Sequence, residues 1–273
     1  MEHKLTEFLS TPTLKRKDRD YEDLFDDFVS FCSGARVRDL FEIPDGKQNA
    51  DYFIPLDKLE IVLELKQITK YEKYNSVDEY FLKELSKGKL RKLSPPQGGK
   101  ITILPESLPK SEWDKFYKRF RPSVSNNLNK AASQLRDTES FLPVTNSARV
   151  KGVILFNSGD YNLPTDLLFR LAEWKLAKEW KMGNYNSIDF VSCLTIDMYK
   201  EGQSPLHARH IAKTLADQNS VNAVAYLYDR WIYYTATAFG LSVSFEESGS
   251  QVDKPTDLNT PFQGKIKYEL QGS

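Results

Sequence analysis

Two apolar, strand-like runs separated by a short polar turn constrain the fold of this chain most. Residues 50–54 and 59–68 are rich in Ile, Val, Leu and aromatic side chains. Runs of this composition around a turn predict a β-hairpin. Yet Asp51, Glu64 and Lys66 lie inside the two runs. A hairpin with three charges in its apolar strands needs a reason other than the packing of a core.

The rest of the chain predicts helices that alternate with further strands. Apolar residues recur at helical spacing in 21–32 and 163–180, and an Asn cap followed by helix formers predicts a helix at 126–138. Continuous apolar runs at 149–158 and 188–199 indicate buried strands. The sequence therefore predicts an α/β fold with a mixed central β-sheet flanked by helices.

Weaker patterns complete this outline. Alternation at 35–43 favours a first strand, and a loop-rich section is expected from residue 94 to about residue 125. Residues 76–92 and 204–218 are expected to be helical, and aromatic, β-branched runs follow within 221–245. No shift in composition divides the chain into two domains.

We expect one domain over residues 1–245. Its motif core spans 21–158, includes a basic insertion at 83–121, and is followed by a C-terminal extension. Residues 246–273 are predicted to be a polar tail in which 265–270 could form a terminal strand.

Charge and cysteine content limit which binding partners and which cellular compartment we expect for this protein. Lys plus Arg equals Asp plus Glu at 38 each, so a basic surface for nucleic acid has to be local. Cys32 and Cys193 have apolar neighbours and no metal-ligand spacing, so we expect reduced, buried thiols. The N-terminus has no apolar leader segment and no run of ~18 apolar residues occurs, which predicts a cytoplasmic protein without a membrane partner.

The expected pairing of the hairpin brings two carboxylates together. A two-residue turn at Asp57 and Lys58 places Asp51 opposite Glu64. Directly opposed side chains of an antiparallel pair share a face, with Cβ atoms ~4.5 to 5.5 Å apart. A bulge, or the proline in the turn, would shift this register by one residue.

This pairing favours a cation site. Two close carboxylates repel, and an apolar sheet disfavours their ionisation unless a cation lies between them. Mg²⁺ is suited because it takes oxygen ligands and keeps several waters, and Mn²⁺ can substitute. Lys66 projects from the same face as Glu64 and can orient or deprotonate a water for phosphodiester hydrolysis. The alternative is a structural ion pair, which adds little net stability to a core.

Asp51, followed by Glu64-Leu65-Lys66 on a hairpin after an N-terminal helix, resembles the PD-(D/E)xK nuclease superfamily, with its restriction-endonuclease-like fold. The order of predicted elements across 21–158 is similar to that of the family. The resemblance implies that Asp51, Glu64 and the Leu65 carbonyl hold Mg²⁺, and that Lys66 is the water-orienting base.

Further residues gain roles from the same resemblance. Glu22 matches the acid that many members add from the first helix, with a solvated helix face as the alternative. Gln134 and Lys130 lie where members carry polar residues that support the site, with an exposed helix surface as the alternative. The chain departs from the motif at Ala50, where the nominal residue is Pro. Asp45 follows a literal proline and is a rival to Asp51, although its surroundings indicate a turn.

The insertion between motif and following helix is the local basic region. It holds eleven Lys or Arg against four Asp or Glu, a net charge of +7, interleaved with aromatic side chains. Such a segment can bind phosphates and stack on bases, or be a solvated loop with its own apolar cluster. The candidate nucleic-acid contacts are Lys87, Lys89, Arg91, Lys92, Lys118, Arg119, Arg121 and Lys130.

The resemblance implies a Mg²⁺-dependent endonuclease with DNA favoured over RNA, of a kind found in restriction, repair or antiviral defence. A homodimer or a larger complex is expected, because cutting both strands needs two sites. The alternative is a non-catalytic nucleic-acid-binding or assembly subunit that kept the fold. His207 and His210, spaced i, i+3 on an expected helix, have no acidic or Cys partner at a suitable spacing and predict no metal site.

Overall fold

The charged runs form the predicted hairpin. In a computed structural model of the chain, β2 (Tyr52–Pro55) and β3 (Leu59–Ile68) pair antiparallel. Tyr52 lies opposite Leu63, which is the register expected for a two-residue turn. Asp51 directly precedes β2, so it enters the sheet at the predicted position.

The structure describes residues 22–68, 110–157, 165–196, 206–213, 217–238 and 252–253. The helix predicted at 76–92, most of the basic insertion and the strand predicted at 265–270 lie outside these residues. Of the predicted polar tail, only the backbone of Val252–Asp253 is described.

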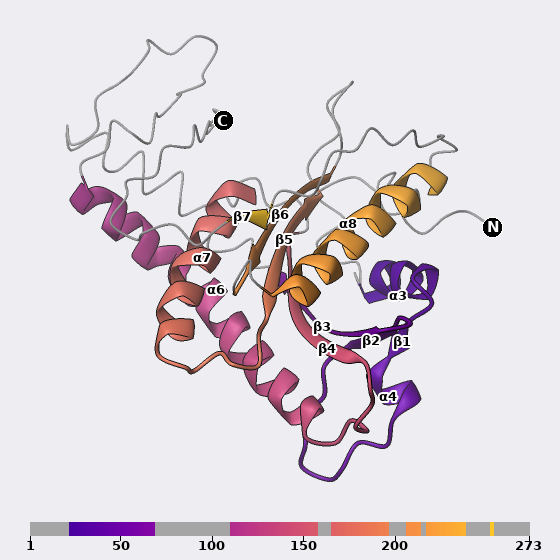
Figure 1. Cartoon of the computed structure of the whole chain (residues 1–273). Coiled ribbons are helices and arrows are strands. Elements are labelled where there is room, and N and C mark those ends of the chain that lie inside the picture. The colour runs from indigo at the N-terminus through magenta and orange to yellow at the C-terminus, as the bar shows by residue number, and fades with distance from the viewer. Residues whose placement is uncertain are drawn as a thin grey trace.

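Among the described residues, seven strands form one mixed sheet whose order follows the sequence from β1 to β7 (Figure 1). β2 is antiparallel to β1 and β3, and β5 is antiparallel to β6, whereas β3, β4 and β5 run parallel. β7 pairs parallel with β6. The strands not yet given are β1 (Ala35–Arg36), β4 (Ala148–Asn157), β5 (Phe190–Ile196), β6 (Leu206–Ala212) and β7 (Val252–Asp253).

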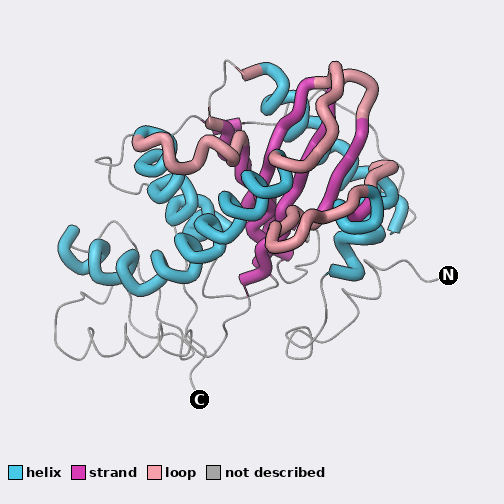
Figure 2. The backbone as a smooth tube through the Cα atoms, turned by 90° about the horizontal axis from the view of Figure 1, so that it is seen from below, coloured by secondary structure: helices cyan, strands magenta, loops and turns pink. Residues whose placement is uncertain are grey.

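Helices cover both faces of this sheet, which confirms the predicted α/β class. α6 (Lys110–Glu139) and α7 (Thr165–Lys181) connect the parallel strands and cover one face. α3 (Glu22–Phe31) and α8 (Gln218–Ala238) cover the other face (Figures 1 and 2). Parallel strands need such crossover helices, and both of their faces are then buried.

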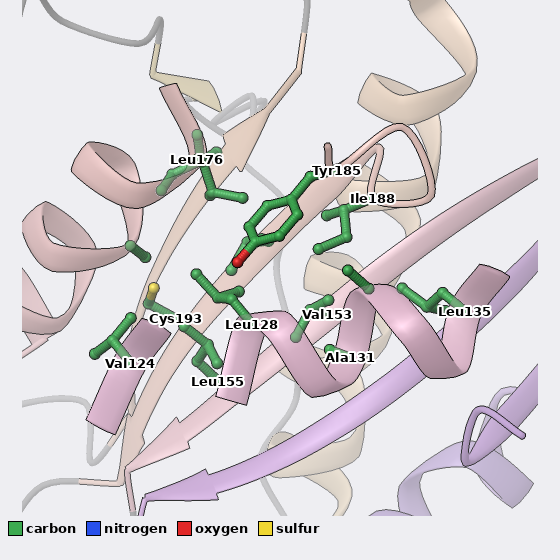
Figure 3. Close-up of a cluster of buried hydrophobic side chains, with 14 of the residues drawn as sticks. Val124, Leu128, Ala131, Leu135, Val153, Leu155, Leu176, Tyr185, Ile188 and Cys193 are labelled. Carbon is green, nitrogen blue, oxygen red and sulfur yellow. The ribbon is translucent and has the colours of Figure 1, made fainter. Parts of the chain in front are cut away.

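Alternating side chains of the central strands feed two separate cores. On the α6 side, Leu128 and Leu135 pack with Val153 of β4 (Figure 3). On the α3 side the core is aromatic, and the rings of Phe28 and Trp231 are 4.6 Å apart between centroids. The continuous apolar run of β4 is therefore explained by burial on both faces.

Several predicted elements are wrong in type or extent. Residues 206–212 form strand β6 rather than a helix, because the full length of β5 pairs with them and pairing outweighs a weak helical propensity. The aromatic, β-branched runs within 221–245 were given no helix by the sequence, yet residues 218–238 form α8, with apolar residues at helical spacing in the α3-side core. The first strand is limited to β1, and the short helix α4 (Val37–Leu40) follows it.

The expected loop up to residue 125 is also wrong from residue 110 onward. α6 begins at Lys110 and continues through Pro122. Most residues before Pro122 are adequate helix formers, and the proline removes only one backbone hydrogen-bond donor from the helix. Cys32 and Cys193 are buried and unbridged, as predicted. None of the described helices has the length and apolarity needed to cross a membrane.

Candidate active site

Glu64 and Lys66 lie on the α6-facing side of β3, between two residues of the apolar core. Val62 and Ile68 belong to that core, and alternation along the strand points Glu64 and Lys66 the same way. Glu64 is completely buried. The Lys66 ammonium donates to Glu64 Oε1, and it also donates to Gln134 Oε1 on α6 at 2.8 Å. The structure therefore brings together the predicted glutamate, lysine and supporting glutamine.

Asp51 lies beside this pair. Its Oδ2 accepts a 2.8 Å hydrogen bond from the backbone N–H of Leu65, the residue between Glu64 and Lys66. Its carbonyl accepts a 3.0 Å bond from Val37 N. The rival Asp45 is exposed in a turn, so the residue that the fold places beside Glu64 is Asp51.

The carboxylates of Asp51 and Glu64 repel each other. Burial and, to a lesser extent, the negative charge of Asp51 raise the pKa of Glu64 to about 8, although Lys66 opposes this rise. Burial also raises the pKa of Asp51, against the lowering effects of the Leu65 N–H and the Lys66 charge. The single ammonium group therefore does not fully compensate the buried Glu64 carboxylate and the half-buried Asp51 carboxylate.

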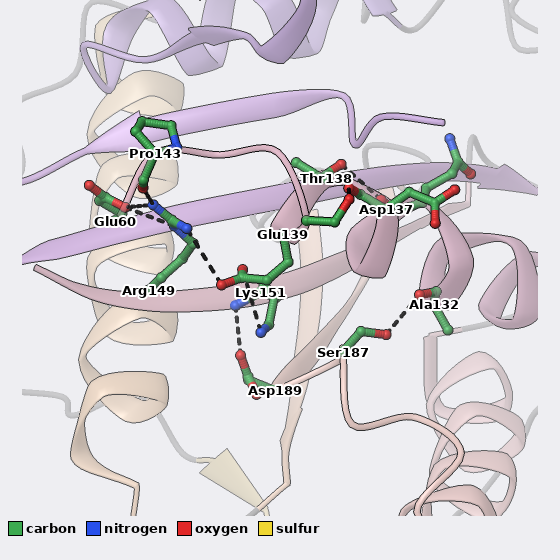
Figure 4. A network of polar contacts seen from close by, with 12 residues as sticks. Glu60, Ala132, Asp137, Thr138, Glu139, Pro143, Arg149, Lys151, Ser187 and Asp189 are labelled. Carbon is green, nitrogen blue, oxygen red and sulfur yellow. Dashed lines mark hydrogen bonds and ion pairs between the residues drawn. The ribbon is translucent and has the colours of Figure 1, made fainter. Parts of the chain in front are cut away.

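Glu60, on the same face of β3 as Glu64, is a buried carboxylate with a purely structural partner. It is buried like Glu64, but Arg149 binds it through Nε at 2.8 Å and Nη2 at 2.7 Å (Figure 4). Arg149 also donates to Pro143 O at 2.7 Å and to Glu139 at 3.4 Å. A guanidinium that satisfies a buried carboxylate is the expected structural solution. Glu64 has no such partner, and its Oε2 is buried without a hydrogen-bond partner.

The site has donors that fit a hard cation. Asp51 and Glu64 supply carboxylates, the Leu65 carbonyl belongs to the residue whose N–H bonds Asp51, and Glu64 Oε2 has no hydrogen-bond partner. Within the described ranges no three His, Cys, Asp or Glu side chains form a metal-holding group, so two carboxylates are the limit there. Mg²⁺ is commonly held by one or two carboxylates together with water. The residues present therefore fit Mg²⁺, with most of its coordination left to solvent and substrate.

Glu22 reaches the margin of the site but is engaged with an arginine. Its Oε2 is 2.8 Å from Arg36 Nη1, and Arg36 also binds both oxygens of Asp26 at 2.7 and 2.6 Å. Glu22 and Arg36 both act on Asp51, since the acid raises the pKa of Asp51 and the arginine lowers it. The predicted acid of the first helix is thus a neighbour of the site whose charge Arg36 offsets.

The remaining predicted residues are dispersed. Lys130 is exposed on α6, one turn before Gln134. The guanidinium of Arg121 lies 3.8 Å from the centre of the Trp174 ring. Lys118 and Arg119 belong to α6 by their backbone, but their side chains are not described. The remaining four, Lys87, Lys89, Arg91 and Lys92, lie outside the described residues.

His207 and His210 do not lie on the helix that the sequence had predicted. Both residues belong by their backbone to strand β6, not to a helix. His210 is buried, and its Nδ1 lies 2.8 Å from Ser192 Oγ on β5.

Three contributors to the site were not predicted from the sequence. Arg36 joins Glu22 to the start of the sheet, Asn49 accepts from Gln134 at 3.2 Å, and Thr138 binds the backbone of Ala50 at 2.6 Å. Of the three, only Thr138 could have been predicted from the sequence. It lies four residues after Gln134 and therefore on the same face of the helix.

Searches against protein-family models, curated proteins and solved structures found no match to this chain.

Proposed function

We propose that this chain is a Mg²⁺-dependent nuclease of the PD-(D/E)xK type that hydrolyses phosphodiester bonds, with DNA as the expected substrate. The observation that carries the proposal is the buried Glu64 carboxylate, which has one lysine, a neighbouring Asp51 and an oxygen without a hydrogen-bond partner. An apolar core gains nothing from such an arrangement, and Glu60 on the same strand has the arginine that Glu64 lacks.

Asp51, Glu64 and the Leu65 carbonyl are the groups that would hold the ion. When bound, Mg²⁺ would polarise the scissile phosphate and lower the pKa of the attacking water. Asp51 is held in place by the Leu65 N–H at 2.8 Å, and Glu64 is fixed by burial and by Lys66. Both carboxylates therefore need little reorganisation, which favours cation binding.

Lys66 is placed to orient the attacking water. Gln134 Oε1 holds its ammonium group at 2.8 Å and keeps it beside Glu64, where the side chain is only 16% exposed. Glu22 adds negative charge at the margin, moderated by Arg36. The roles of acid, lysine and supporting amide thus fall on residues that are in direct contact with one another.

Substrate binding is assigned to the basic insertion and to α6. The exposed Lys130 lies one turn from Gln134, on the helix that continues directly from the insertion. Cationic side chains along such a path can neutralise phosphates independently of sequence. Because the described part of each chain holds one candidate site, cutting both strands would require a homodimer or a larger complex, as in a restriction, repair or antiviral defence system.

A non-catalytic nucleic-acid-binding or assembly subunit is the second candidate. It is favoured by the limited ligand set, since the described residues contain no group of three metal-ligating side chains. In that case the Lys66–Glu64 pair would be a remnant that shapes the hairpin without binding an ion.

Plasmid cleavage separates the two candidates. We expect wild type to cut DNA with Mg²⁺ or Mn²⁺, and Glu64→Ala or Lys66→Ala to lower the rate by about 100-fold or more. Glu60→Gln is the matched control, because it removes a buried charge from the same strand face outside the site. Nucleic-acid binding without metal-dependent cleavage of DNA or RNA would support the second candidate instead. Equal cleavage by wild type and all variants would overturn the assignment of the active site to Glu64 and Lys66.

A further inference from the structure

The segment that leads into β2 is held by the last turns of α6. Residues 48–50 form neither helix nor strand, yet each makes a contact with that helix. Gln48 N donates to Asp137 Oδ2 at 3.4 Å, and Asn49 O accepts from Gln134 Nε2 at 3.2 Å. An irregular segment that carries a catalytic carboxylate at its end depends on contacts of this kind for its geometry.

Thr138 makes the shortest of these contacts, 2.6 Å from Ala50 N to its Oγ1. The same hydroxyl donates to the carbonyl of Gln134, one turn earlier, at 2.8 Å. Its one proton is therefore used within the helix, and a lone pair remains for the Ala50 N–H. Thr138 and Ala50 are both completely buried, so water cannot replace either partner.

These contacts close a ring around the candidate site. Ala50 leads directly to Asp51, whose Oδ2 is bonded to Leu65 N at 2.8 Å. The next residue, Lys66, is held by Gln134 at 2.8 Å, and Gln134 returns to Asn49. The last turns of α6 therefore fix both the lysine and the segment that delivers the first carboxylate.

We propose that Thr138 is a positioning residue of the candidate active site: its buried hydroxyl sets the place of Asp51 relative to Glu64 and Lys66. This inference rests on the proposed nuclease function. It assigns Thr138 no contact with substrate or metal, and it gives the buried hydroxyl of Thr138 a main part in fixing the geometry of the ligand pair. Partners of this kind around metal ligands typically contribute 10- to 100-fold in affinity or activity.

The test compares three variants of the full chain by Mn²⁺ titration calorimetry and plasmid cleavage. Thr138→Val keeps the shape but leaves the Ala50 N–H without an acceptor. It is expected to weaken Mn²⁺ binding and lower kcat by about 10-fold or more, with KM for DNA unchanged. Thr138→Ser keeps the hydroxyl and is expected to stay near wild type in both measurements.

Ser187→Ala is the matched control. Ser187 Oγ donates to the carbonyl of Ala132, on the same helix as Thr138, at 2.7 Å (Figure 4). Its removal is expected to lower stability but not Mn²⁺ affinity or kcat. A purely structural role of Thr138 would make Thr138→Val behave like Ser187→Ala, and that result would overturn the proposal.

Other outcomes are equally decisive. Loss of Mn²⁺ binding in Thr138→Ser as severe as in Thr138→Val would overturn the role of the hydroxyl. If Thr138→Val does not fold, amide hydrogen exchange of wild type decides: Mn²⁺ is expected to slow exchange at Ala50 and Leu65 together, and an unchanged Ala50 overturns the proposal. A wild type that binds no Mn²⁺ and cuts nothing would instead refute the proposed function itself, and this inference with it.

Discussion

Glu64 makes the stability of the molecule depend on pH in an unusual direction. Its pKa is about 8 in the folded chain against an ordinary value of 4.5. The folded state then keeps a proton that the unfolded state has already lost. The free energy of unfolding is therefore expected to fall as pH rises from about 4.5 to 8, by up to about 1.4 kcal/mol per pH unit from this group.

Urea unfolding at a series of pH values checks this expectation. Glu64→Gln, which cannot ionise, is expected to flatten the decline across that range. Glu60→Gln is expected to keep it, because Glu60 has its own arginine partner. Equal slopes in wild type and Glu64→Gln would show that another group is responsible.

Mg²⁺ should act on the same group. A cation that binds Asp51 and Glu64 has to displace the proton, so its effect on stability is expected to grow as pH rises. Thermal unfolding with and without millimolar Mg²⁺ at pH 6 and pH 8 measures this difference. We expect a larger increase in Tm at pH 8 for wild type and no increase for Glu64→Gln. An increase that persists in Glu64→Gln would place the ion elsewhere.

The sequence was sufficient to predict contacts between residues of the β2–β3 hairpin, because their pairing depends on a single turn. A two-residue loop determines the register of the hairpin, so the proximity of Asp51 to Glu64 followed from counting. Arg36 and Thr138 could not be found in this way. Their partners are 14 and 88 residues away, and only the docking of whole helices brings them together.

At the scale of elements, one arginine joins α3 to the sheet. Arg36 binds Asp26 through two parallel hydrogen bonds and is itself mostly buried. Asp26→Asn replaces this charged pair, and we expect the free energy of unfolding to fall by about 1 to 2 kcal/mol. Asp23→Asn, on the exposed side of the same helix turn, should change it by less than about 0.5 kcal/mol.

Chemical denaturation of the two variants at neutral pH provides the comparison. A similar loss in both would mean that the acidic character of α3, rather than the Arg36 contact, stabilises its docking. No loss in either would mean that the aromatic core beneath α3 holds the helix without the ion pair.

Element type was predictable where periodicity and length agreed, as in α3, α7 and β4. It failed at β6 and α8, where local composition and tertiary context disagree. His210 reads as helical in its local sequence, yet its backbone pairs with Ser192 and its ring is buried there. Trp231 and Tyr234 favour strands by residue type, but their spacing matches one face of a helix over an aromatic core.

Across the whole molecule, the two cores share their strands. Trp180 packs against the α6-side core, and Trp231 belongs to the α3-side core. Because β3, β4 and β5 contribute to both, neither core can be lost without exposing the back of the other. We expect both indoles, followed separately by fluorine NMR of 5-fluorotryptophan, to report one unfolding midpoint. Two separate midpoints would show that the layers unfold independently.

The overall class was predictable because strand and helix signals alternate through the middle of the chain, which is typical of parallel strands with crossovers. The edges of the sheet were not. β1 and β7 have two residues each, too few for any periodic pattern, and only their neighbours define them as strands.

The order of the strands also has a consequence for biosynthesis. Since spatial order follows chain order, a polypeptide emerging from the ribosome can add each strand to the edge of the previous one, without inserting a strand between two that are already paired. The residues that hold Asp51, Glu64 and Lys66 all precede the end of β4 at Asn157. The candidate active site can therefore be assembled while the remaining strands and α8 are still being translated.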